Sequence, residues 1–518
     1  MLIGSEARMR KSFHPLIEIM DTTLRDGEQT TGVSFIPSEK QTIARLLLQD
    51  LGVDRVEVAS ARVSEGEREA VSRICHWAEQ EGFLDRVEVL GFVDGRQSVD
   101  WLLDCGCRRL NLLCKGSLSH CRYQLKKEPE EHLADILRTV DYAVSRGVGV
   151  NVYLEDWSRG MEQSEYVYGL MDGLKDAPIS RFMLPDTLGI LNPLRVIEYM
   201  RKMVKRYPEL HFDFHAHNDY DLAISNVLAA VLSGCQGIHT SVNGLGERAG
   251  NAPLSSVQAI LHDQFEARTN VKEENLYRVS RMVESLSGVM LPANKPIVGA
   301  NVFTQVAGVH ADGDVKGRLY ESELKPERFG RRREYALGKQ SGKANIEQNL
   351  RGLGLELTRE QTLAVTKRIT ELGDRKEIVT PDDLPFIVGD VLGHKVEKER
   401  VRLLSYMVAT SQGLHSHASL CIEIDGETYE AAATGDGQYD AFVSGLKQIY
   451  RERLGREFPV LTNYYVTIPP GGRTDALVQT VITWDYKGKT IRMRGLDADQ
   501  TDSAIKATMK MLNQIANY

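Results

Sequence analysis

Two histidines stand two positions apart in the segment Phe212-Asp-Phe-His-Ala-His-Asn218. Successive side chains of a β-strand point to opposite faces, so His215 and His217 lie on the same side if this segment is a strand. Two imidazoles at the end of a strand form half of a divalent metal site. A lone histidine is more often a core residue, but this pair, followed by Asn218-Asp219, favours a metal site over that alternative.

An acidic third ligand is available near the N-terminus, in Asp21-Thr-Thr-Leu-Arg-Asp-Gly-Glu-Gln29. The apolar run before it, residues 16–20, predicts a strand, and Arg25 and Asp26 then follow its carboxyl end. In a closed barrel the last strands return beside the first, so Asp26 can converge with the two histidines. The alternative is a turn with solvated charges, because Asp-Gly is a common turn sequence.

Other candidate residues also lie near the ends of predicted strands. Tyr153 and Glu155 share one face of a strand, where a carboxylate can orient a proton-transfer group or form a structural ion pair. Leu90 and Leu113, on two earlier strands, wall a small pocket if the strand ends form the site and are core residues otherwise. The loop 243–251, with three glycines, predicts a place for a substrate phosphate or carboxylate.

The elements that position these residues follow a simple repeat of a β-branched run, a polar loop and an amphipathic stretch. The predicted strands are 16–23, 53–60, 86–93, 109–114, 149–156, 181–187, 211–218 and 237–246. Helical patterns lie between them, and about eight such units in roughly 250 residues predict a TIM (β/α)8 barrel. An open doubly wound sheet is less favoured, because the polar residues collect at many strand ends and no GxGxxG follows the first strand.

The second half of the chain has a different pattern. We expect a barrel domain over residues 1–275 and a helical linker subdomain over 276–394. Residues 395–518 predict strand-strand-strand-helix twice, which indicates an α+β domain with duplicated βββα units. The overall prediction is therefore an α/β barrel, a helical linker and a C-terminal α+β domain.

Composition narrows the class of protein. A net charge of -8 argues against a nucleic-acid surface. No apolar run is long enough to span a bilayer, and the N-terminus lacks the apolar core of a signal peptide. The seven cysteines are scattered, which fits free thiols in a reducing cytoplasm. We therefore expect a cytoplasmic protein with no nucleic-acid partner and no membrane partner.

Together these motifs resemble the acyl-CoA condensing enzymes that include isopropylmalate, homocitrate and citramalate synthases. The resemblance covers nearly the whole chain and is carried by five ordered segments. They are DTTLRDGEQ at 21–29, HAHND at 215–219, NGLGERAGN at 243–251, AGVHADG at 307–313 and LGKQSG at 337–342. Tyr220-Asp221 stands where isopropylmalate- and homocitrate-forming members usually carry Leu-Gly, and this resembles the citramalate-forming, isoleucine-inhibited type.

The resemblance implies condensation of acetyl-CoA with pyruvate to (R)-citramalate, in a first step towards isoleucine. The alternative is 2-isopropylmalate synthesis from 2-oxoisovalerate. A divalent cation (Mn, Mg, Zn or Co) would bind Asp26, His215 and His217, with Asn243 as a further ligand. Arg25 would stabilise the alkoxide, Thr187 would hold the pyruvate carboxylate, and the pocket walls would be Leu90, Leu113 and Tyr153.

The resemblance also implies roles for residues of the second half. His310 would be the base, helped by Glu155, with Tyr320 near the reacting groups. Because the family supplies this histidine from a neighbouring subunit, a homodimer is expected. The C-terminal domain would bind isoleucine as a regulatory effector, with Tyr439 and Asp440 as candidate contacts, although Asp440 could equally be a helix cap.

Two interpretations of other classes stay open at this point. The acyl-CoA lyases and the biotin-dependent carboxyltransferases run the reverse chemistry on the same barrel. Met509-Lys510-Met511 has the letters of a biotin-attachment motif, but it falls on a predicted helix, where attachment needs a hairpin turn. The second is a non-enzymatic, metal-stabilised barrel, and the presence of Arg25, Glu155 and His310 beside the predicted metal ligands argues against it.

Overall fold

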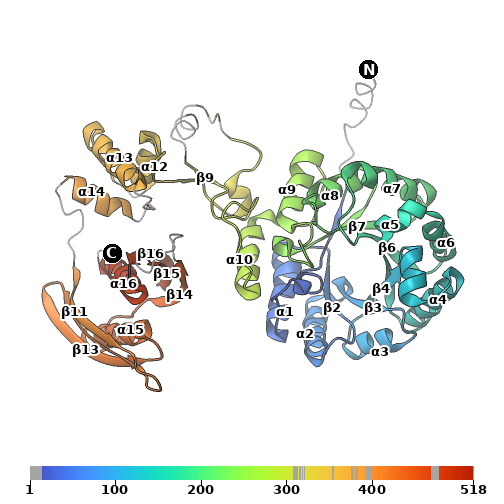
Figure 1. Cartoon of the computed structure of the whole chain (residues 1–518), viewed down its shortest axis with the longest axis horizontal. Helices are drawn as coiled ribbons and strands as arrows, with labels where there is room; N and C mark the ends of the chain where they lie inside the picture. The colour runs from blue at the N-terminus through green and yellow to red at the C-terminus, as the bar shows by residue number, and fades with distance from the viewer. Residues whose placement is uncertain are drawn as a thin grey trace. The chain divides into compact units, whose positions relative to one another are not determined.

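The computed structural model describes residues 15–306, 313, 317, 319, 321–352, 355–374, 379, 383–392, 400–467 and 478–516. The chain divides into two compact units, shown in Figure 1. One unit takes in the chain up to Thr304 together with Lys316–Glu334, and the other takes in Gln305–Val315 and Tyr335–Tyr518. Helix α10 (Leu276–Ser287), which we expected to open the linker, belongs to the first unit.

The first unit is a closed barrel of eight parallel strands in sequential order, surrounded by helices (Figure 1). The strands are β1 (Glu18–Asp21), β2 (Arg55–Ser60), β3 (Val87–Phe92), β4 (Arg109–Lys115), β5 (Gly149–Glu155), β6 (Ile179–Asp186), β7 (Phe212–Ala216) and β8 (Gly237–Thr240). Each overlaps a predicted strand, and the predicted TIM barrel is confirmed. The barrel closes where β1 pairs with β8, which in turn pairs with β7.

The helices begin where the sequence favours them. They are α1 (Pro37–Arg45), α2 (Glu65–Glu81), α3 (Gln97–Asp104), α4 (Pro129–Ser145), α5 (Trp157–Gly160), α6 (Glu165–Leu174), α7 (Pro193–Arg206), α8 (Ala223–Leu232) and α9 (Leu254–Phe265). Proline occupies the first turn of α1, α4 and α7, where its missing N–H is not needed. The Asn192 side chain caps α7 by accepting from the backbone N–H of Arg195.

The interior of the barrel is filled largely by charged and amide side chains. Arg55 of β2 is buried and donates to Glu88 of β3 and, at 2.5 Å, to Asp213 of β7. Glu57 of β2 accepts from the Asn111 side chain of β4 at 2.8 Å. A buried charge is tolerated only when it is paired and hydrogen-bonded, and these contacts supply that pairing.

In the described part of the second unit, three helices are followed by one motif that occurs twice. These are α12 (Lys343–Gly352), α13 (Arg359–Asp374) and α14 (Leu384–Leu392). The first repeat is β11 (Val401–Ala409), β12 (Ser416–Ile424), β13 (Glu427–Gly435) and α15 (Gln438–Gln448). The second is β14 (Val460–Thr467), β15 (Val478–Tyr486), β16 (Lys489–Asp497) and α16 (Gln500–Ala516). Each set of strands forms an antiparallel sheet, so the predicted duplication is confirmed.

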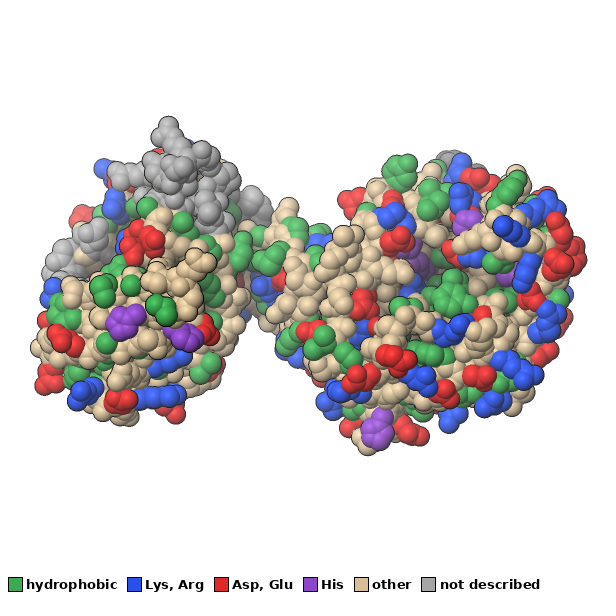
Figure 2. All heavy atoms as spheres, turned by 60° about the horizontal axis from the view of Figure 1, so that its bottom comes forward, with side chains coloured by type: hydrophobic (Ala, Val, Ile, Leu, Met, Phe, Trp, Pro, Cys, Tyr) green, Lys and Arg blue, Asp and Glu red, His purple; other side chains and the backbone are tan. Residues whose placement is uncertain are grey.

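Two short strands, β9 (Thr304–Gln305) and β10 (Glu334–Tyr335), form a separate two-stranded sheet. All seven cysteines are free, as expected. On the face drawn in Figure 2, acidic and basic side chains are interspersed over both units. Among the described residues, none of the helices has both the length and the apolar character needed to cross a membrane.

The polar interior predicts that a single methyl group destabilises the barrel. A Cβ on Gly237 of β8 would lie 2.0 Å from Asp213 Oδ1, so Gly237→Ala must displace Asp213 from Arg55. Separating a buried ion pair costs about 3 kcal/mol, and we expect the free energy of unfolding of the barrel to fall by that amount. Urea titration followed by tryptophan fluorescence measures it.

Gly169→Ala is the matched control, because a Cβ there meets no other atom within 4 Å on α6. Alanine is the better helix former, so this variant should be as stable as the parent or slightly more stable. Equal stability of the two variants would contradict the assigned role of the Arg55–Asp213 pair.

Candidate metal and substrate site

Asp26, His215 and His217 converge at the carboxyl end of the barrel strands. The Nε2 atoms of the two histidines are 3.3 Å apart, and Asp26 Oδ2 lies 3.5 Å from His215 Nε2 and 3.9 Å from His217 Nε2. All three side chains are buried, and together they form a group that can hold a metal ion. We call these three residues the metal set. Strand alternation accounts for the two histidines lying on the same face. Closure of the barrel brings Asp26 to them.

The loop after β1 places Asp26 through a tight turn of backbone. The N–H groups of Arg25 and Asp26 both donate to the carbonyl of Thr22, at 3.1 and 2.9 Å. The Thr22 hydroxyl donates in turn to Glu57 Oε2 of the next strand at 2.8 Å. The turn is therefore tied to β2 as well as to β1, and the direction of the Asp26 side chain follows from it.

A buried lysine anchors the same loop from outside. Lys40 of α1 has no exposed side-chain surface and pairs with Glu28 of the loop at 2.6 Å and with Glu67 of α2 at 2.5 Å. Its ammonium also donates to the carbonyl of Leu24 at 3.0 Å. Lys40 therefore satisfies Glu28 and the loop backbone at once. Sequence reasoning missed this residue, because its ion-pair partners come from two segments, the loop after β1 and α2, that are distant along the chain.

Arg25 controls the electrostatics of the site. Its guanidinium donates to Asp26 Oδ2 at 2.9 Å and to Glu57 Oε2 at 2.6 Å. Burial alone would raise the pKa of Asp26, but Arg25 and the two imidazoles outweigh it and hold that pKa well below its usual range. Burial, and next the neighbouring His215, lower the pKa of His217 to about 3. Asp26 and His217 thus offer free lone pairs at neutral pH.

The residues present fit a divalent cation. Two imidazole nitrogens and a carboxylate oxygen are the ligands that Zn, Mn, Co and related ions share. Asn251 adds a candidate oxygen that sequence reasoning did not single out. It faces His217 across an isolated β-bridge, and its buried Oδ1 has no hydrogen-bond partner within the described chain. An amide oxygen is a suitable further ligand for a hard cation.

The metal set opens into a pocket of about 230 Å³. Figure 2 shows the hollowed face of this unit, with histidine side chains inside the hollow. The pocket brings together nine of the residues expected from the sequence: Arg25, Asp26, Leu90, Leu113, Tyr153, Glu155, Thr187, His215 and His217. Gln29, Ser60, Phe92, Pro185 and Glu247 complete its lining. The apolar walls therefore stand directly beside the metal set.

Two pocket residues have partners of their own. Glu155 forms an ion pair with Lys115, its register neighbour on β4, and it also lines the pocket. Its role in proton transfer stays a prediction. Thr187 follows β6 directly, and its hydroxyl accepts from the N–H of Asp156 at 2.9 Å. Lys115 was missed by sequence reasoning, although it stands two positions after Leu113 as Glu155 does after Tyr153.

Asn243 is not brought to the metal set. Its amide donates to the carbonyl of Ser280 on α10 at 2.9 Å and accepts from the Ser280 hydroxyl. The left-handed backbone at Asn243 (φ 62°) turns the side chain toward that helix. As a metal ligand Asn243 stays a prediction, and it would have to leave Ser280 to become one.

The other predicted residues lie away from the pocket or outside the described chain. His310 and Tyr320 fall outside the described residues. In the second unit, the hydroxyl of Tyr439 lies 2.7 Å from Thr508 Oγ1 of α16, and its ring stacks at an angle on Tyr464. Asp440 accepts from the N–H of Asp436 at 3.0 Å, which closes the turn before α15. Their effector role stays a prediction.

The glycine-rich loop closes one side of the pocket. The N–H of Gly246 donates to the Thr30 hydroxyl at 2.8 Å, and the N–H of Glu247 donates to Asp26 Oδ1 at 3.3 Å. Arg248 holds Asp219 through two hydrogen bonds of 2.8 and 2.9 Å. The loop therefore links the segments after β1 and β7, and one of its N–H groups, that of Glu247, contacts the Asp26 carboxylate.

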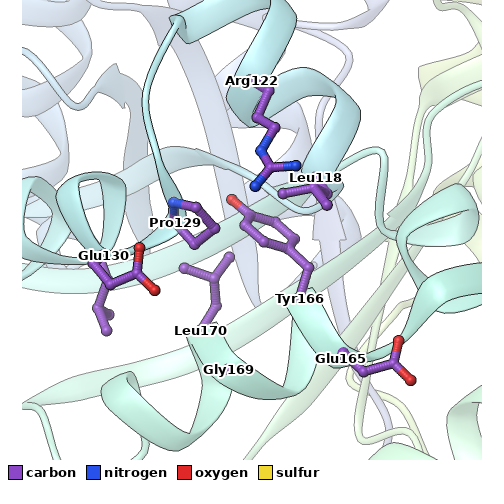
Figure 3. Close-up of a pocket in the computed structure, with 9 residues that line it drawn as sticks. Leu118, Arg122, Pro129, Glu130, Glu165, Tyr166, Gly169 and Leu170 are labelled. Atoms are coloured by element: carbon purple, nitrogen blue, oxygen red, sulfur yellow. The ribbon is translucent and has the colours of Figure 1, made fainter.

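A second cavity, of about 340 Å³, lies on the outside of the barrel (Figure 3). It is lined by the short segment η4 (His120–Leu125) and by α4 and α6, and Figure 3 shows Arg122 reaching toward Tyr166 across it. Its lining is mostly apolar and includes none of the nine residues gathered in the pocket. The chemistry-bearing residues are thus concentrated at the barrel mouth.

Metal binding by the convergent set is directly testable. We expect His217→Ala to weaken binding of Co2+ or Mn2+ by more than the roughly 10- to 100-fold caused by losing an outer partner of a ligand. Calorimetry on chelator-treated protein measures the affinity, and Co2+ absorption reports the coordination. His262→Ala is the control, since that exposed histidine pairs with Asp263 away from the pocket. Equal affinities for both variants would refute the site.

Three family models match successive parts of the chain. The HMGL-like family model matches residues 16–283, the homocitrate synthase post-HMGL domain-like model 297–377, and the LeuA allosteric (dimerisation) domain model 378–516. Among solved structures, the HMG-CoA lyase of Bacillus subtilis has 23% identity and a TM-score of 0.46, covering 54% of this chain and 96% of its own.

Two curated relatives match over nearly the full length. A 2-isopropylmalate synthase of Methanocaldococcus jannaschii is 34% identical, covering 96% of this chain and 94% of its own. An (R)-citramalate synthase CimA of the same organism is also 34% identical, covering 97% of this chain and 100% of its own. The chain therefore belongs to the family of isopropylmalate, homocitrate and citramalate synthases, which are acetyl-CoA-condensing transferases.

Proposed function

We propose that this protein condenses acetyl-CoA with pyruvate and water to give (R)-citramalate and CoA, with a divalent cation as cofactor. The observation that carries the proposal is the pocket, where Leu90, Leu113 and Tyr153 crowd the space beside the metal set. A methyl substituent fits such a space better than an isopropyl group. The two relatives named for citramalate and isopropylmalate synthesis are equally identical to the chain, so the choice of pyruvate in this proposal rests on pocket shape.

The metal set and Arg25 would act on the keto group of pyruvate. A divalent cation bound by Asp26, His215 and His217 supplies a Lewis acid at this position. Arg25 uses its Nε and Nη1 atoms on Glu57 and Asp26, and it lines the pocket. Because Glu57 and Asp26 hold the guanidinium in place, Arg25 stabilises the alkoxide oxygen with little reorganisation.

Other pocket residues would hold the substrate and move protons. Thr187 lies at the end of β6 and binds the pyruvate carboxylate in this proposal. Glu155 assists removal of a proton from the acetyl methyl group, with His310 as the base and Tyr320 nearby. The Lys115–Glu155 ion pair supports this placement of Glu155, because it fixes the carboxylate at the edge of the pocket.

The second unit would carry regulation and assembly. The LeuA allosteric (dimerisation) model over residues 378–516 supports a homodimer whose C-terminal domain binds isoleucine. Tyr439 and Asp440 are the proposed effector contacts, at the start of α15. The seven free thiols support a cytoplasmic location.

The first test is substrate choice. We expect metal-loaded protein with acetyl-CoA to release free thiol fastest with pyruvate, among pyruvate, 2-oxobutyrate, 2-oxoisovalerate and 2-oxoglutarate. Isoleucine should suppress the release and leucine should not. Preference for 2-oxoisovalerate would favour the isopropylmalate alternative and leave the metal site intact. No release with any keto acid would leave the lyase and binding-protein interpretations.

The apolar side chains that wall the pocket provide a second test of substrate choice. Leu113→Ala removes apolar volume next to Tyr153, so kcat/KM for 2-oxobutyrate relative to pyruvate should rise by about 10-fold, the lower range for one methylene in an apolar pocket. Leu194→Ala, on an exposed position of α7, is the matched control and should leave the ratio unchanged. An unchanged ratio in Leu113→Ala would exclude this wall as a determinant of substrate size.

A further inference from the structure

The floor of the pocket is a phenol ring that crosses the barrel. Tyr153 belongs to β5, but its hydroxyl lies 3.0 Å from Nδ1 of His239 on β8, which is three strands away in the closed sheet. The side chain is nearly fully buried, and its ring meets those of His239 and His215 edge to face. One face of this ring therefore borders the pocket while its hydroxyl points into the polar interior.

The hydrogen bonds below the ring have a fixed direction. Nε2 of His239 lies 3.1 Å from Asp213 Oδ2, and the same oxygen accepts from Arg55 Nη2 at 2.5 Å. A carboxylate paired with a guanidinium is an acceptor, so the proton of His239 must sit on Nε2. Nδ1 is then an acceptor, and the Tyr153 hydroxyl must donate to it.

Asp213 is itself held on both oxygens. Its Oδ1 lies 2.9 Å from Nε2 of His211, and Gly237 leaves the space in which the carboxylate sits. The chain Asp213–His239–Tyr153 thus fixes the tautomer of the histidine, the rotamer of the phenol and the position of the ring. A ring held at its far end by a hydrogen bond cannot tilt without breaking it.

We propose that His239, oriented by Asp213, is a positioning residue that locks Tyr153 as a rigid floor and so sets the size of the keto acid that the pocket accepts. This inference rests on the proposed function, because keto-acid size is its readout. Leu90 and Leu113 can restrict the pocket from the side only if the Tyr153 ring packed with them stays in place. When the hydroxyl is released, the floor can yield to a longer acyl chain.

Two variants of His239 separate its two hydrogen bonds. The amide oxygen of asparagine stands near the position of Nδ1, so His239→Asn can still accept from Tyr153. The amide nitrogen of glutamine stands near Nε2, so His239→Gln can still donate to Asp213 but loses Tyr153. Tyr153→Phe keeps the ring and removes only the hydroxyl, and it tests the same bond from the other side.

The measurement is kcat/KM for pyruvate and for 2-oxobutyrate, with the melting temperature of each variant. We expect the pyruvate-to-2-oxobutyrate ratio to fall by about 3- to 10-fold in His239→Gln and in Tyr153→Phe, the factor that one neutral hydrogen bond contributes. His239→Asn should stay within about 2-fold of the parent, and the Gln–Phe double variant should fall no further than either single variant.

A purely structural role for His239 predicts another result. His239→Gln and Tyr153→Phe would then melt earlier and lose activity with both keto acids alike, at an unchanged ratio, and this would overturn the inference. If His239→Gln does not fold, the ratio in Tyr153→Phe decides alone. A pyruvate-selective parent with unchanged variants refutes only the inference, whereas a parent without CoA release overturns the proposed function and the inference together.

Discussion

The site depends on one buried cation, the guanidinium of Arg25. It lies between Asp26, which belongs to the metal set, and Glu57, which belongs to the barrel interior. Without Arg25, both carboxylates would be buried without a cationic partner at these positions, and an isolated ionised group in such an environment is very unfavourable. The same contact therefore keeps Asp26 ionised for a metal and connects the mouth of the barrel to the network below it.

That network explains why an α/β barrel has so polar an interior. The side chains of a TIM barrel usually fill the centre with branched apolar groups. Here Arg55 pairs with Glu88 and Asp213, Arg25 pairs with Glu57, and glycine at position 237 leaves room for a carboxylate. Buried ion pairs are weak sources of stability but demand good geometry, so they favour one arrangement of side chains over its neighbours. The side chains of the pocket above this network are therefore also held in one arrangement.

The sequence predicted those features that depend on local periodicity. Strand alternation was sufficient for the same-face pair His215 and His217, and eight repeated units were sufficient for the barrel that brings Asp26 to them. It did not predict Lys40 or His239, because their partners come from strands and helices far apart along the chain. Asn243 was placed by its motif, whereas the side chain is directed by a left-handed backbone and by Ser280 on α10.

The proposed choice of keto acid depends on side chains from two sets of strands. Leu113, Tyr153 and Met183 are register neighbours across β4, β5 and β6, so the walls and the near edge of the floor belong to one continuous row. The hydroxyl end of the Tyr153 ring is held from β8, by the side chain of His239. Few residues separate a small pocket from a larger one in such an arrangement. This is consistent with relatives of equal identity that carry the names of two different synthases.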